Sequence, residues 1–223
     1  MELLNISMAR AVWLLDIAEL NPRGKTIMPE LLEWAKEEYH FEKAPANVTD
    51  MDEKTKSLNF DRGQFQVREE FFVDVALKIF NDGFVAETCS STRDSEAFLK
   101  DVVESATKEF SLAYKPEMVR AKMSTSEVFI RSTKDLAGIN PKLSEFMAKM
   151  ANLIPTIPGS DYTVASIAFW AVRRPLPDMS LAQFRFERKI GSLPHENKYY
   201  SSAPLHTDDH LALLDEFETT FMT

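Results

Sequence analysis

The residues best suited to chemistry in this chain lie near its C-terminus, where two histidines flank two aspartates in the segment LHTDDHLALLDEFE. His206, Asp209 and His210 could supply imidazole and carboxylate ligands to a metal ion, as a metal-dependent hydrolase would require. A helix start explains the same segment, because Thr207 is a good N-cap and the carboxylates of Asp208 and Asp209 suit the positive end of a helix dipole. We favour the helix start. On that interpretation His206 precedes the cap, so its spacing to His210 does not place both histidines on one helical face.

A second candidate is a local excess of positive charge in residues 162–203, where six lysines and arginines stand against three aspartates and glutamates. With aromatic residues nearby, such a stretch could contact an anion, a phosphate group or a nucleic acid. A solvated hairpin face, balanced by acidic helices elsewhere, is the interpretation that we favour. The candidate ligand-binding residues of this basic stretch are Trp170, Arg173, Arg174, Arg185, Arg188 and Lys189.

Nucleophilic catalysis has little support in the sequence. The single cysteine, Cys89, excludes an intramolecular disulfide and most thiolate zinc sites. As a nucleophile it would need a base close in space, and His195, His206 and His210 all lie in the other half of the chain. We therefore predict a buried, structural cysteine. Six glycines leave no glycine-rich phosphate loop of the usual spacing, so no cofactor is expected and a non-enzymatic role is favoured.

Composition limits the partners. Hydrophobic residues make up 44% of the 223 residues and charged residues 27%, as in a globular protein with a substantial core. The net charge of -9 disfavours nucleic acid and anionic membranes as partners. No apolar run approaches the roughly 20 residues of a membrane span, and the first ten residues do not resemble a secretory signal. A cytoplasmic location is therefore expected.

Hydrophobic periodicity predicts the same order of elements in both halves of the chain. In the first half the hairpin is the clearest signal, because apolar residues alternate up to a turn at Asn81, Asp82 and Gly83. The elements expected there are a strand at 7–17, a helix at 28–41, an irregular strand pair at 58–67, a hairpin at 70–91 and a helix at 92–112.

In the second half, Asn140 and Pro141 mark the N-cap and first position of a helix. The elements expected there are strands at 126–132, 162–174, 181–190 and 197–203, and helices at 139–154 and 207–222.

Three pairs of segments indicate an internal duplication. In the last pair Thr92 falls on Thr207, so apolar residues of the two closing helices coincide, with Phe98, Leu99 and Val102 on Leu213, Leu214 and Phe217. A single α+β domain whose halves merely look alike is the alternative. The pairs are DIAELNPR with DLAGINPK, PELLEW with PKLSEF, and TRDSEAFLKDVVE with TDDHLALLDEFE.

The fold expected from this pattern is α+β, a tandem pseudo-repeat of two strand-helix-strands-helix units covering residues 1–115 and 116–223. The two halves would share one antiparallel sheet with the helices packed on one face. The other face would remain open to a ligand, a partner chain or a second copy.

One hairpin resembles the TATA-binding proteins, whose saddle is a tandem duplication of such a unit. Their pattern Ile-Phe-x-x-Gly-x-x-x-x-Thr matches IFNDGFVAET at Ile79, Phe80, Gly83 and Thr88. The resemblance implies a shared fold, and contacts with the DNA minor groove at the positions of Phe80 and Thr88. The chain has Phe84 where the family has a lysine, its second half lacks the pattern, and it is acidic, so we carry over the fold and not DNA binding.

These observations favour a non-enzymatic binding or assembly module that recruits a protein partner, or itself, through the open sheet face. Nucleic-acid or phosphate-ligand binding through the basic hairpin at residues 166–190 is the alternative, and a metal-dependent hydrolase at the last helix is the third hypothesis.

Overall fold

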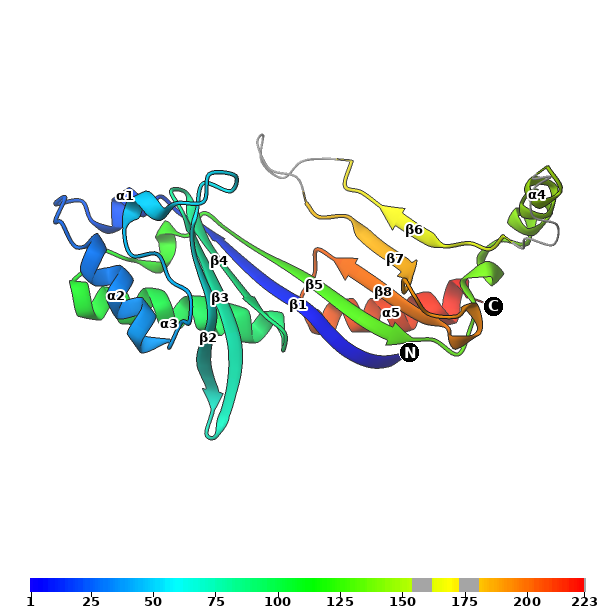
Figure 1. Ribbon diagram of the computed structural model, residues 1–223, viewed down its shortest axis with the longest axis horizontal. Helices are drawn as coiled ribbons and strands as arrows, with labels where there is room; N and C mark the ends of the chain where they lie inside the picture. The colour runs from blue at the N-terminus through cyan, green and yellow to red at the C-terminus, as the bar shows by residue number, and fades with distance from the viewer. Residues whose placement is uncertain (154–161, 173–180, 223) are drawn as a thin grey trace. The chain divides into compact units, whose positions relative to one another are not determined.

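The computed structural model describes residues 1–153, 162–172 and 181–222, and its strands form one antiparallel sheet of eight (Figure 1). This confirms the α+β class. The strands are β1 (Glu2–Leu14), β2 (Leu58–Arg68), β3 (Phe71–Phe80), β4 (Gly83–Thr88), β5 (Ala121–Arg131), β6 (Ser166–Phe169), β7 (Phe184–Arg188) and β8 (Lys198–Ala203). The α-helices are α1 (Ile17–Leu20), α2 (Met28–Glu38), α3 (Thr92–Phe110), α4 (Pro141–Asn152) and α5 (Thr207–Phe221), and the 3-10 turns are η1 (Val48–Asp50), η2 (Pro116–Met118), η3 (Leu136–Ile139) and η4 (Pro194–Glu196).

The strand order is β2-β3-β4-β1-β5-β8-β7-β6. Read outward from the two central strands, it is β1-β4-β3-β2 on one side and β5-β8-β7-β6 on the other. This equal order is what a duplicated chain would give, and the duplication itself stays a prediction.

Contacts divide the chain into two compact units. We call residues 8–126 with 205–207 the α3 unit, and residues 1–7, 127–204 and 208–223 the α5 unit. The long strands β1 and β5 each contribute to both units, so this division does not run through the linker between α3 and β5 where the sequence suggested a boundary.

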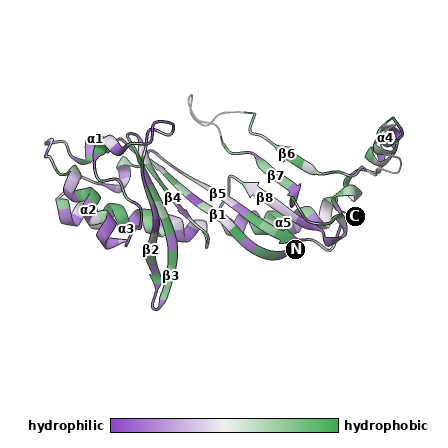
Figure 2. Cartoon of the chain, viewed as in Figure 1, coloured by the Kyte–Doolittle hydropathy of each residue, from purple (hydrophilic) through white to green (hydrophobic). Residues whose placement is uncertain are grey.

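The predicted hairpin is confirmed in the α3 unit, where β3 and β4 pair from Val75–Thr88 to Phe80–Gly83. Alternate residues of β3 are buried, while Asp74 and Lys78 interrupt its apolar sequence (Figure 2). Gly83 is required at the turn, because a Cβ atom there would lie 2.2 Å from the Trp13 carbonyl oxygen. The apolar stripe of α3 covers this side of the sheet and is buried as predicted, at Phe98, Leu99, Val102, Val103 and Ala106.

The core of the α5 unit lies between the end of β5, strands β7 and β8, and helix α5. Phe186 and Tyr199 stack with ring centroids 4.7 Å apart, and Phe217 lies against Phe186. Leu214 and Phe217 of α5 are buried, but Leu213 is 39% exposed. The expectation that Leu213 shares the buried face is therefore wrong, since one residue turns a helix by about 100°.

Three predicted elements have other bounds or forms. The first strand is Glu2–Leu14 rather than residues 7–17, and it ends before Asp16, which accepts a hydrogen bond from the Ala18 N–H and starts α1. Residues 58–67 belong to the single strand β2, which shifts register against β3 near Arg62, at φ 58°. The long strand expected at 162–174 is limited to Ser166–Phe169 within the described residues.

The helix at α4 is confirmed, including its cap: the Asn140 side chain accepts a hydrogen bond from the Lys142 N–H. Helix α5 is also confirmed, but Thr207 is its first residue rather than its N-cap. The Thr207 hydroxyl accepts the first amide of α3 instead, as described below.

Candidate functional site

The predicted metal ligands have separate surroundings. His210 is fully buried, and its Nε2 lies 2.8 Å from the Ser201 hydroxyl. Ser201 donates to the Arg185 carbonyl oxygen at 2.7 Å, so it accepts the hydrogen from His210 Nε2. The imidazole therefore carries its proton on Nε2 and cannot act as a base toward Ser201, which makes this pair structural.

Burial lowers the pKa of His210 to about 4, so the ring is neutral near pH 7. Its other nitrogen, Nδ1, is buried and has no hydrogen-bond partner among the described residues. In the alignment of the two closing helices His210 replaces Ser95, whose hydroxyl lies 3.0 Å from Thr88. Both residues thus connect the first turn of a helix to a strand beneath it.

His206 is exposed, and its Nδ1 lies 3.2 Å from the Ser124 hydroxyl and 3.3 Å from the Thr92 hydroxyl. Asp209 is exposed on α5. Throughout the described ranges, no group of three or more His, Cys, Asp or Glu residues is placed to hold a metal ion. The structure therefore does not bring His206, Asp209 and His210 together, and a metal site stays a prediction.

Thr92 and Thr207, which the alignment paired, exchange hydrogen bonds within the α3 unit. The Thr92 N–H donates to the Thr207 hydroxyl at 3.0 Å, and the Thr207 N–H donates to the Thr92 hydroxyl at 2.9 Å. Both residues are buried. Because the first amides of a helix have no partner within it, each threonine supplies the acceptor that the other helix lacks. The Thr92 hydroxyl then has its hydrogen left to donate to His206 Nδ1.

The described cations of the basic stretch do not form one patch. Arg173 and Arg174 lie outside the described residues. Arg188 forms an ion pair with Asp135 and lies over the Tyr199 ring, on the side of the sheet that faces the core of the α5 unit. Arg185 is exposed, and its neighbour Phe186 is buried in the core, so Arg185 points the opposite way to Arg188.

Trp170 is 76% exposed. Cys89 is exposed as well, so the expectation of a buried cysteine is wrong. It follows Thr88, which is buried on the helix side of β4, and strand alternation therefore turns Cys89 outward.

The sheet face of the α5 unit opposite its core carries an aromatic pair. The rings of Phe129 on β5 and Tyr200 on β8 are 5.5 Å apart, and both residues are half-buried. Lys189 places its Nζ 5.0 Å from the centre of the Phe129 ring. Tyr200 is directly paired with Glu187 on β7. We call this surface the open face, and its residues are Glu127, Phe129, Arg185, Glu187, Lys189 and Tyr200.

The charges of the open face balance, with two cations and two carboxylates around the ring pair. Burial raises the pKa of Tyr200 to about 12, assisted by its hydrogen bond to Glu127 and by the charge of Glu187. The phenol therefore stays a neutral donor.

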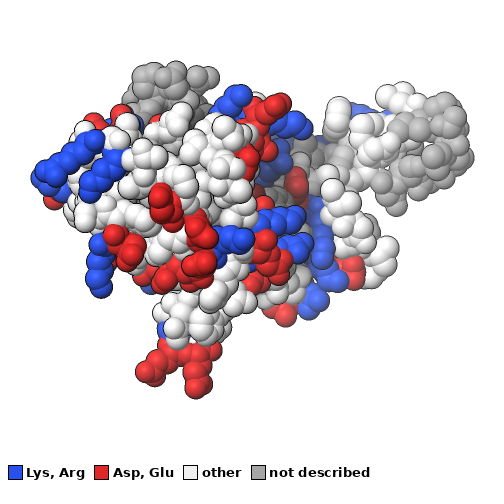
Figure 3. Space-filling model, turned by 60° about the vertical axis from the view of Figure 1, so that its left-hand side comes forward, with Lys and Arg blue, Asp and Glu red and all other residues white. Residues whose placement is uncertain are grey.

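The corresponding side of the α3 unit is also neutralised. Glu87 Oε1 accepts hydrogen bonds from Arg10 and from Lys78, each at 3.0 Å. Burial would raise the pKa of Glu87, but Lys78 and Arg10 outweigh burial and lower it. Figure 3 shows acidic and basic side chains interspersed on the visible surface. At these described residues, cations and carboxylates neutralise each other, whereas nucleic acid requires an extended basic surface.

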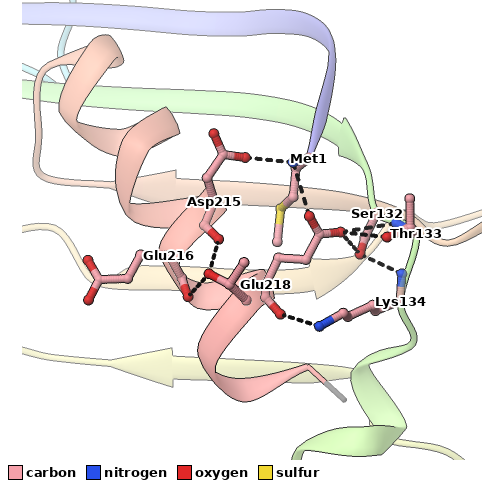
Figure 4. A network of polar contacts seen from close by, with 8 residues as sticks. Met1, Ser132, Thr133, Lys134, Asp215, Glu216 and Glu218 are labelled. Carbon is pink, nitrogen blue, oxygen red and sulfur yellow. Dashed lines mark hydrogen bonds and ion pairs between the residues drawn. The ribbon is translucent and has the colours of Figure 1, made fainter.

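A polar network holds the end of α5 (Figure 4). The Met1 amine lies 2.6 Å from Asp215 and 3.0 Å from Glu218, and Glu218 also accepts hydrogen bonds from the Ser132 hydroxyl and the Thr133 N–H. Burial alone would raise the pKa of Glu218, but these hydrogen bonds outweigh it and hold the pKa below its usual value. The network ties β1, β5 and α5 together and is structural.

Comparison of the chain with models of known protein families, and with curated proteins, gave no match. The resemblance to the TATA-binding proteins therefore stays an expectation about the fold. Thr88, which that resemblance placed at DNA, is 3% exposed and hydrogen-bonded to Ser95 under α3. No helix in the described part of the chain is both long and apolar enough to cross a bilayer.

Sequence reasoning did not single out Phe129 and Tyr200. Alternation was the available signal: in EVFIR the buried Val128 and Ile130 flank Phe129, and in KYYSS the buried Tyr199 precedes Tyr200. Only strand pairing shows that the two outward rings meet.

Proposed function

We propose that this protein is a non-enzymatic assembly module that binds a second copy of itself through the open face. The observation that carries the proposal is the Phe129–Tyr200 pair, with Lys189 over one ring, on a side of the sheet turned away from the α5 core. Aromatic and arginine side chains are the types that most often dominate protein interfaces, and Arg185 is paired with Ser202, two residues along β8 from Tyr200.

Charge supports a second copy over other occupants. In a two-fold interface the same patch occurs on both subunits, so a patch with both signs of charge can complement itself. The open face has two cations, Arg185 and Lys189, and two anions, Glu127 and Glu187. Nucleic acid would require a net positive surface, which this balance does not provide.

The test is sedimentation of the purified chain over a wide concentration range. We expect the wild type to form a dimer, and the Phe129→Ala/Tyr200→Ala double variant to be monomeric. Each truncation of a central aromatic residue should cost about 2 kcal/mol, which is about thirtyfold in the dissociation constant. The matched control is Phe72→Ala, which removes a ring that is 57% exposed at the end of the β2–β3 hairpin.

Two results would overturn the proposal. One is a wild type that stays monomeric at every concentration. The same result is expected if the open face binds a different protein and not a second copy. The other is a double variant that loses no more dimer than the Phe72→Ala control, while circular dichroism shows the native fold for both.

A further inference from the structure

The α3 unit contains an apolar pocket with a volume of about 90 Å³ between helices α1, α2 and α3 and the sheet. Its walls include Leu31 and Trp34 of α2, Val103 and Ala106 of α3, and Ile79 of β3. Protein interiors are packed as closely as organic crystals, and they contain few voids larger than a water molecule. This pocket is therefore larger than the voids that a close-packed core usually leaves.

Water is a poor occupant of this pocket. A buried water needs two to four polar partners. The one amide side chain in the lining belongs to Asn21, and it is already engaged, because Nδ2 donates to the Lys25 carbonyl oxygen at 2.8 Å and Oδ1 accepts from the Lys25 N–H. Apolar cavities of this kind stay dry and admit apolar molecules, as an engineered cavity of about 150 Å³ that binds benzene shows.

The attachment of α2 to the rest of the α3 unit is compatible with entry of a ligand into the pocket. The helix begins at Met28 without a side-chain cap, and the preceding loop includes Gly24 at φ 59°. Its buried residues, Leu32 and Ala35, attach it to the unit by apolar contacts. The pocket is also partly open, so a ligand longer than the cavity can extend toward solvent.

We infer that this pocket is a binding site for small apolar molecules, namely single aromatic rings or short alkyl chains. The site is independent of the open face, since every lining residue belongs to the α3 unit. Burying an apolar ring replaces its contact with water by contact with the apolar walls, which is favourable roughly in proportion to the area buried.

The probe is toluene, followed by methyl NMR of the full chain. We expect saturable shifts at the methyl groups of Leu31, Ile79 and Val103. At a toluene concentration ten times the dissociation constant, the unfolding equilibrium constant should fall about elevenfold. Phenol has the same shape, but its hydroxyl must either stay at the open side of the pocket or be buried without a partner, so phenol should bind more weakly than toluene.

The variant is Ala106→Leu, which fills the pocket from α3, and the matched control is Ala97→Leu on the exposed side of the same helix. Toluene binding should be lost in the first variant and kept in the second. Val103→Ile adds a single methylene to the same wall, and toluene binding is measured with this variant if Ala106→Leu does not fold. Absence of saturable shifts in the wild type, or binding that survives filling in a folded variant, would overturn the inference.

Discussion

The exchange of hydrogen bonds between Thr92 and Thr207 makes a quantitative prediction about Thr92→Val. Valine keeps the branched shape but removes the acceptor of the Thr207 N–H, at a site where Thr92 is fully buried. The Thr207 hydroxyl, 3.3 Å away, loses its acceptor too. A buried donor left without a partner costs about 1–3 kcal/mol, so we expect a loss of about 2 kcal/mol in the free energy of unfolding. For a chain of this size that lowers Tm by about 4–8 °C.

Urea unfolding followed by circular dichroism measures this loss, and two variants isolate its cause. Thr92→Ser keeps the hydroxyl and removes a methyl group, so it should cost only about 1 kcal/mol. Thr107→Val removes a hydroxyl from the same helix that donates to the Val103 carbonyl oxygen, and it leaves no amide unsatisfied. If Thr92→Val were no worse than Thr107→Val, or if Thr92→Ser cost as much as Thr92→Val, the reasoning would be refuted.

Three further outcomes are expected. Burial lowers the pKa of His210 to about 4, so below about pH 6.5 the unfolded chain takes up a proton there before the folded chain does. Urea titrations should therefore show the free energy of unfolding falling by up to about 3 kcal/mol toward pH 4, and the slope of that free energy against pH should be flatter in His210→Gln. The pKa of Glu218 lies below its usual value, since hydrogen bonds such as that from Ser132 outweigh burial, so its contribution should be complete above about pH 4.5, be lost as the pH falls further, and be absent from Glu218→Gln. Thermal unfolding should show that Arg188→Ala, which breaks a half-buried ion pair, costs about 1 kcal/mol, whereas Arg185→Ala at an exposed position stays within about 0.5 kcal/mol.

Local pattern was sufficient for the hairpin and for both closing helices. Alternation in VDVALKI and the turn residues ending in Gly83 correspond to two strands that are joined by a tight turn and paired with each other. The stripe of α3 is likewise a property of one helix. These features depend on residues close in sequence, and for that reason they could be predicted without the fold.

The candidate sites depended on contacts between distant residues, and there prediction was weaker. Arg188 and Arg185 belong to one basic stretch of the sequence, yet in the fold one pairs with Asp135 and the other is exposed to solvent. His206 and His210 look like a pair, but each finds its own hydroxyl partner, Ser124 or Ser201, more than eight residues away along the chain. Composition near a site does not reveal such pairings, because they are created by strand register and by the packing of helices.

The division of β1 between the two units has a consequence for the order of events on the ribosome. Residues 1–7 belong to the α5 unit, whose other residues begin only at Glu127. During synthesis most of the α3 unit can form before the residues that pack against residues 1–7 have been made. The acceptor of the Thr92 N–H, the Thr207 hydroxyl, is synthesised later still. During that interval the start of β1 has no neighbouring strand to pair with, and an unpaired strand can form hydrogen bonds with another chain. We therefore expect nascent chains of this protein to be most prone to aggregation before residues 127–207 emerge, and slowed synthesis over that stretch to lower the yield of folded protein.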